Sequence, residues 1–194
     1  LEQTRQRMVD ATEALEEGRL SQALSSSTRA ERDLNRLQQE FREQTSARFA
    51  EAMRDLRTAA RAAGQRQAEL SQALTESEQQ PTTPGLRAEK SQQELSREFQ
   101  EQRAAVGAIL EQARQVVQES ETAEPLLSRQ LYDTLRQTRD DQLEPALEAV
   151  PQLLQRGFVP EARQAETQAR QALERLQAGV DRAAEGVLGN EVEA

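Results

Sequence analysis

Two series of apolar residues with the same spacing dominate this sequence. The first recurs in steps of four and three, with one double step of seven, and comprises Phe49, Met53, Leu56, Ala60, Ala63, Leu70 and Leu74. The second has the same spacing, with the polar Gln102 at one of its positions, and comprises Leu95, Phe99, Gln102, Val106, Ile109, Ala113 and Val116. A repeat of about 3.5 residues is that of helices packed along one narrow stripe, as in a left-handed coiled coil. The two series predict long helices that lie antiparallel, because only a short connection separates them.

Composition supports helices with a thin core. Aromatic residues make up only 3% of the 194 residues, there is no Trp, and 30% of the residues are charged. Ala, Leu, Glu, Gln and Arg are abundant, and all five lose little side-chain freedom in a helix. The sequence therefore predicts an all-α protein, an elongated antiparallel helical bundle with coiled-coil-like packing and helical hairpins near both ends.

Glycine and proline divide the chain into segments. We expect a hairpin plus a long helix over 1–80, a Pro/Gly turn at 81–85, a second long helix over 86–124, shorter helices ending in a hairpin over 125–188, and a frayed tail at 189–194. Gly18, Pro125 and Gly157 mark the predicted helix boundaries inside these segments. Steps of four and four at Phe41, Thr45 and Phe49 predict a stutter, which locally unwinds a supercoil.

The residues around Gly18 recur 139 positions later. Leu15, Gly18, Ala23, Ala30, Leu34, Arg36, Leu37 and Gln38 match Leu154, Gly157, Ala162, Ala169, Leu173, Arg175, Leu176 and Gln177. The pattern predicts two related hairpins, in which Gly makes the turn and the alanines allow two helices to approach closely. Two unrelated helices of the same composition would also share some identities. If the hairpins bind a partner, we expect an exposed apolar strip, with Leu24, Leu34, Leu173 and Leu176 as candidate interaction residues.

The sequence offers little for catalysis. Without His or Cys, the chain lacks the commonest general base, the commonest metal ligand and the thiol nucleophile. The acidic pairs Glu16–Glu17 and Asp140–Asp141 are best interpreted as solvated helix charges, and no Gly-rich phosphate loop is present. We therefore predict no catalytic, cofactor-binding or metal-binding residues, and no enzyme.

Large side chains and a serine run complete the expected packing. We expect Phe41, Phe49, Phe99 and Phe158 to anchor the core, and the single tyrosine, Tyr132, to cover a bundle edge. The run Ser25-Ser26-Ser27 is expected to form a strip of small residues that faces another helix, with a phosphorylation site as the alternative.

The run from Met8 to Leu74, with ALEEGRLSQAL, DLNRLQQEFREQ and RFAEAMRDLRTAA, resembles the helical region of DUF4175-like proteins. These are large bacterial envelope proteins of the planctomycete type. The resemblance implies a periplasmic or extracytoplasmic location and a membrane anchor elsewhere in a longer protein, and the alternative is the cytoplasm. A start at Leu1, already within a helical pattern, also leads us to expect a piece of a longer protein.

Charge and hydropathy limit the partners. A net charge of −9 argues against nucleic acid, and no apolar run reaches the roughly 18 residues that span a bilayer. We expect a protein partner or a homo-oligomer, with no direct membrane insertion by this segment. The favoured function is a non-enzymatic structural or protein-interaction module, such as a spacer, scaffold or oligomerisation arm. The alternatives are a hairpin module that binds a peptide or partner helix, and a ligand-sensing helical bundle of a membrane receptor.

Overall fold

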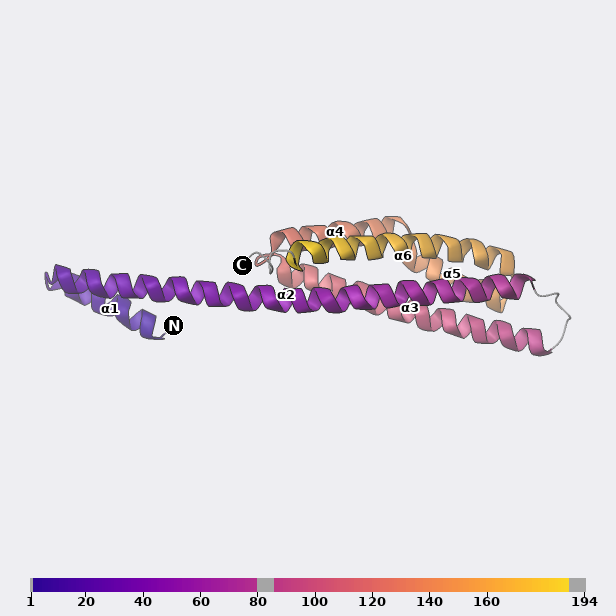
Figure 1. Cartoon of the computed structure of the whole chain (residues 1–194), viewed down its shortest axis with the longest axis horizontal. Helices are drawn as coiled ribbons and strands as arrows, with labels where there is room; N and C mark the ends of the chain where they lie inside the picture. The colour runs from indigo at the N-terminus through magenta and orange to yellow at the C-terminus, as the bar shows by residue number, and fades with distance from the viewer. Residues whose placement is uncertain (1, 80–85, 189–194) are drawn as a thin grey trace. The chain divides into compact units, whose positions relative to one another are not determined.

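The computed structural model describes residues 2–79 and 86–188, which form six α-helices and no strand (Figure 1). The helices are α1 (Glu2–Glu16), α2 (Leu20–Gln79), α3 (Leu86–Ser120), α4 (Pro125–Asp140), α5 (Leu143–Gln155) and α6 (Val159–Leu188). The predicted all-α helical bundle is confirmed. The predicted turn at 81–85 and the frayed tail at 189–194 lie outside the described residues.

The chain divides into two units, Leu1–Arg48 and Phe49–Ala194. The division falls inside α2, where the predicted stutter places steps of four and four before Phe49. Phe49 is buried in the larger unit, whereas Phe41, two steps earlier, is mostly exposed. A stutter changes which face of a helix the apolar residues occupy, and it falls here at the boundary between the two units.

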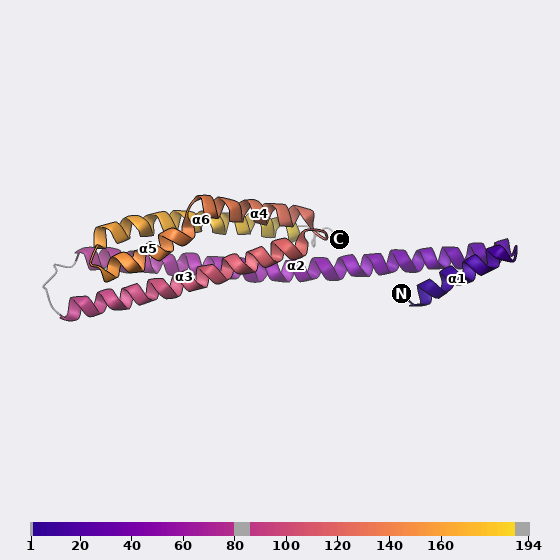
Figure 2. The same ribbon diagram turned by 180° about the vertical axis from the view of Figure 1, so that it is seen from behind.

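Within the larger unit, α2 and α3 lie side by side and antiparallel (Figure 2). The Gln102 side chain donates a hydrogen bond to the Ala63 carbonyl at 2.8 Å, and Arg66 pairs with Glu98 at 3.1 Å. From the first contact to the second, the residue number rises along α2 and falls along α3, so the two helices run in opposite directions. The predicted antiparallel pairing of the two long helices is confirmed for this unit.

Both predicted apolar series form the core of the larger unit. Every member of the two series is buried, including the polar Gln102. The main buried cluster joins Met53, Leu56, Val106 and Ile109 to residues of α4, α5 and α6, and a second cluster surrounds Phe99. Burying a large apolar side chain contributes about 1.5–3 kcal/mol, so the two series contribute to this core together with the buried residues of α4, α5 and α6.

Helices α4, α5 and α6 complete the larger unit, where α5 and α4 each contact both α3 and α6. Pro125 occupies the first turn of α4, where its missing N–H has no intrahelical partner in any case. Pro151 lies inside α5 and is buried, and its carbonyl accepts a hydrogen bond from the Ser96 hydroxyl at 3.1 Å. This bond links α5 to α3.

The prediction that four phenylalanines anchor the core holds for two of them. Phe49 and Phe99 are buried, but Phe41 is mostly exposed and Phe158 is half exposed, so the prediction that these two anchor the core is wrong. Phe41 belongs to the smaller unit, in which the buried apolar residues among those described are all alanines. Phe158 lies in the turn directly after Gly157. Tyr132 is exposed on α4. Ser25 and Ser27 are also exposed, which contradicts the serine strip except at the half-buried Ser26.

Candidate interaction surface

The smaller unit carries an open apolar groove of about 840 Å³ between α1 and the first part of α2. We call it the α1–α2 groove. It is lined by Met8, Ala11, Thr12, Leu15, Leu20, Ala23, Leu24, Ser27, Ala30, Glu31, Leu34 and Asn35. Leu24 is 70% exposed, although a leucine at a helix face usually packs against a neighbour. The groove therefore concentrates large apolar side chains that the unit itself does not cover.

The groove is open because alanines make the contact between the two helices. Ala14, Ala23 and Ala30 are buried there, and Arg7 of α1 forms an ion pair with Asp33 of α2. Small side chains allow the helix axes to approach closely, and this leaves the larger leucines outside the contact. The hairpin thus buries little apolar surface and presents its bulkiest residues outward.

The turn of this hairpin has the same hydrogen-bond pattern as the turn between α5 and α6. Gly18 and Gly157 both have positive φ, at +74° and +79°. Gly18 donates to the Leu15 carbonyl and Arg19 to that of Ala14, while Gly157 donates to Leu154 and Phe158 to Leu153. Both turns are Schellman motifs, which end a helix with a left-handed residue. The 139-residue repeat therefore reproduces local geometry as well as residue identity.

The two hairpins differ in what covers their apolar faces. Leu15 in the groove is 58% exposed, whereas its counterpart Leu154 is 1% exposed; Leu34 is 40% exposed and its counterpart Leu173 is 1% exposed. Leu154 belongs to the buried cluster that contains Leu70 and Leu74 of α2 with Leu95 and Phe99 of α3. The same face is thus covered by two helices in the α5–α6 hairpin and open in the α1–α2 hairpin.

The four candidate interaction residues differ in exposure between the two hairpins. Leu24 and Leu34 are exposed and line the α1–α2 groove. Leu173 and Leu176 are buried in the main core, so the prediction that they form an exposed strip is wrong. The larger unit's own helices already satisfy their apolar side chains.

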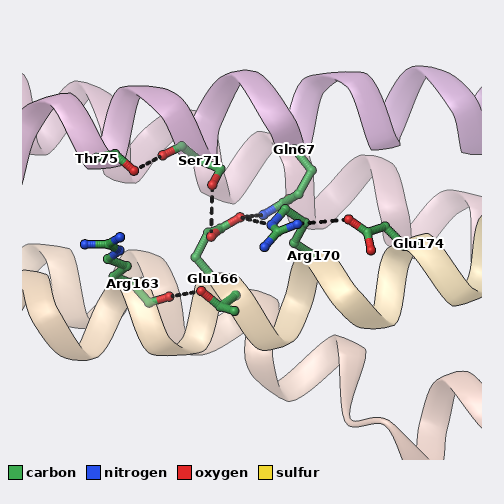
Figure 3. A network of polar contacts seen from close by, with 8 residues as sticks. Gln67, Ser71, Thr75, Arg163, Glu166, Arg170 and Glu174 are labelled. Atoms are coloured by element: carbon green, nitrogen blue, oxygen red, sulfur yellow. Dashed lines mark hydrogen bonds and ion pairs between the residues drawn. The ribbon is translucent and has the colours of Figure 1, made fainter.

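A buried polar network lies between α2 and α6 (Figure 3). Glu166 is almost completely buried and accepts hydrogen bonds from Gln67 at 3.2 Å and from Ser71 at 3.1 Å. Arg170 lies 3.9 Å from the same carboxylate, and its guanidinium also pairs with Glu174 at 3.0 Å. The network gives a buried carboxylate several polar partners, as its desolvation requires.

Sequence reasoning missed Gln67 and Glu166, although the apolar spacing could have found them. Gln67 follows Ala63 by four residues and precedes Leu70 by three, and Glu166 stands in the same relation to Ala162 and Ala169. Both therefore occupy buried positions of the repeat. Glu166 corresponds to Ser27 of the groove at the 139-residue offset, so the network lies on the face that is open in the α1–α2 hairpin.

Ion pairs that are exposed or partly buried border the contacts between helices of the larger unit. Arg57 and Arg61 both contact Asp181, at 2.7 and 3.0 Å, and Arg163 contacts Glu78 at 2.6 Å. A side-chain hydrogen bond to Glu69 raises the pKa of Arg66, which also pairs with Glu98 of α3. The solvent-exposed pair between Arg66 and Glu98 is of a kind that contributes up to about 1 kcal/mol, so such pairs add little to the stability that apolar burial provides.

The described part of the chain contains no cluster of three or more acidic side chains suited to a metal ion. In the same residues, no helix is long and apolar enough to cross a bilayer. Comparison with protein-family models, with curated proteins and with solved structures gives no match. The resemblance to DUF4175-like proteins stays a prediction.

Proposed function

We propose that this chain is a non-enzymatic scaffold or protein-interaction module whose α1–α2 groove receives helices of a protein partner. One observation carries this proposal. The groove exposes Leu15 and Leu34, and the larger unit buries their counterparts Leu154 and Leu173 beneath other helices. In the α5–α6 hairpin, other helices cover this face. We therefore expect helices of a partner to cover the equivalent face of the α1–α2 hairpin, which is open.

The energetics of the smaller unit support a need for such a partner. Two helices held mainly by alanines gain little from burial, and short isolated helices are marginally stable in water. Covering Leu15, Leu20 and Leu24 would contribute about 1.5–3 kcal/mol for each fully buried side chain. Partner binding would therefore stabilise the hairpin that creates the groove.

Other occupants suit the groove less well. Leu20 and Leu24 remain about 70% exposed, so a small molecule would stay in contact with water, whereas ligand pockets commonly bury most of the ligand surface. Helices that bind membrane surfaces usually carry a basic polar face, but residues 1–48 hold eight arginines against nine acidic residues. A protein partner with apolar helical faces can cover the exposed leucines and needs no basic face on this unit.

The larger unit would serve as the scaffold that carries the groove. Its core is continuous from Phe49 of α2 to Val180 of α6, and its helices hold one another through both buried clusters. The coiled-coil-like spacing of α2 and α3 supports a role as spacer. The resemblance to DUF4175-like envelope proteins supports an extracytoplasmic place for this scaffold.

Affinity capture of the full chain from its native cell, with chemical cross-linking, tests the proposal. We expect Leu24→Asp to lose partner capture, because it places a charge among the groove leucines. Leu126→Asp is the matched control, since Leu126 is 77% exposed on α4, outside the groove. Equal capture by both variants would exclude the groove as the interaction surface.

A further inference from the structure

We propose that the occupant of the α1–α2 groove is a second copy of this chain, so that two α1–α2 hairpins pack face to face as a four-helix bundle. This inference rests on the proposed function and names the partner for the same surface.

The internal repeat shows the kind of surface that covers such a face. In the larger unit, Val150, Leu154 and Ala162 of the α5–α6 hairpin share a buried cluster with two antiparallel helices, α2 and α3. Those helices contribute Leu70, Leu74, Leu95 and Phe99. A second α1–α2 hairpin offers the same elements, two helices joined by a tight turn with leucines on one face. It therefore supplies a helix pair of the type that the repeat already accepts.

Net charge favours the smaller unit as the place of self-association. Residues 1–48 carry eight arginines and nine acidic residues, for a net charge of −1, so the other residues carry −8 of the chain's −9. Two copies that meet through their larger units bring strong like charges together. Two copies that meet through the smaller units bring together nearly neutral surfaces, which minimises this repulsion.

The groove lining is suited to contact with itself. In a two-fold symmetric dimer the same patch is used on both chains, so apolar residues must meet apolar residues. Met8, Leu15, Leu20, Leu24 and Leu34 supply the apolar surface. Glu31 is the only charged residue in the lining, and Thr12, Ser27 and Asn35 supply side-chain donors for a carboxylate of the partner copy. In the dimer, these donors of one copy can therefore bind the Glu31 carboxylate of the other copy.

Analytical ultracentrifugation of the full chain over a wide concentration range is the decisive measurement. We expect a reversible monomer–dimer equilibrium for the wild type. Because each substitution occurs twice in a symmetric dimer, Leu24→Asp should weaken dimerisation by about 100-fold or more. Leu126→Asp should leave the equilibrium unchanged. A second variant, Leu20→Asp, should act like Leu24→Asp. At a concentration below dimer formation, circular dichroism should show the helicity of the wild type in all three variants.

Hydrogen exchange at a low and a high protein concentration locates the dimer contact. We expect amides in residues 8–35 to gain protection as the dimer forms, and amides of α4 to show no change. Protection confined to the larger unit would overturn the inference. A wild type that stays monomeric at every concentration would also overturn it, as would a dimer that resists both groove substitutions.

The two proposals fail separately. If the wild type is monomeric and Leu24→Asp still abolishes capture of a different protein, the groove is an interaction surface and the second copy is not its occupant. If the wild type is monomeric and capture is indifferent to Leu24, both proposals are wrong.

Discussion

Gln67 of α2 donates a hydrogen bond to the carboxylate of Glu166 on α6 across the buried interior of the larger unit, at 3.2 Å. Both residues occupy positions of the heptad-like spacing at which the flanking residues are Ala or Leu. Among the described residues, the Oε1 atom of Gln67 has no hydrogen-bond partner. Desolvation offsets much of the attraction in a buried pair of this kind, so its net contribution to stability is small.

Replacing one member of this pair should cost more than replacing both. We expect Gln67→Leu to lower the free energy of unfolding by about 1–3 kcal/mol, because Glu166 loses a donor while staying buried. The double variant Gln67→Leu with Glu166→Leu should recover most or all of this loss. Urea denaturation of the wild type, both single variants and the double variant measures the coupling. Additive single effects would show that the two side chains do not interact.

Gly179 of α6 is required by the close approach of α4. A Cβ atom at this position would lie 2.3 Å from Cγ2 and 2.5 Å from Oγ1 of Thr134, whose hydroxyl is held by the Gln130 carbonyl. We therefore expect Gly179→Ala to destabilise the protein by about 1–3 kcal/mol, although alanine favours a helix. Thermal unfolding measures the effect.

Gly107 of α3 provides the matched control, since nothing lies within 4 Å of a Cβ placed there. Gly107→Ala should stabilise the protein by about 0.5–1 kcal/mol through helix propensity alone. A similar gain for Gly179→Ala would mean that α4 and α6 are farther apart than described.

The sequence predicted helix positions and buried series well, since these depend on local signals. Gly18 and Gly157, both at positive φ, end α1 and α5, and this signal is local to the sequence. The spacing from Phe49 onward identifies the side of α2 that faces α3. Burial in the hairpins was not predictable in this way. Leu34 and Leu173 have equivalent sequence surroundings, and only the presence of neighbouring helices makes one exposed and the other buried. The periodicity of the sequence predicts which face of a helix is apolar, but it does not predict which element covers that face.

The same pair of leucines gives a sharp test of the fold. Leu173→Ala should lower the free energy of unfolding by about 2–5 kcal/mol, because it leaves a cavity in the main core. Leu34→Ala, at the equivalent position of the α1–α2 hairpin, should change it by less than about 1 kcal/mol in the monomer, since water already reaches this side chain. Chemical denaturation at a concentration below dimer formation compares the two. Equal losses would show that the groove is closed by other parts of the chain.

The two glycine turns should differ in how far the effect of a substitution spreads. Alanine at Gly18 or Gly157 must adopt a positive φ, which costs about 1–2 kcal/mol at either position. Gly157→Ala should lower the unfolding temperature of the larger unit, because α5 and α6 both belong to its core. Gly18→Ala should leave that temperature unchanged and speed hydrogen exchange in α1, because the cost falls on a hairpin that has little apolar burial to offset it.

A dimer contact through the α1–α2 groove adds one expectation: Gly18→Ala should also weaken self-association, whereas Gly157→Ala should not. Loss of dimer in neither variant, with faster exchange in α1, would show that an intact hairpin is not needed for the contact.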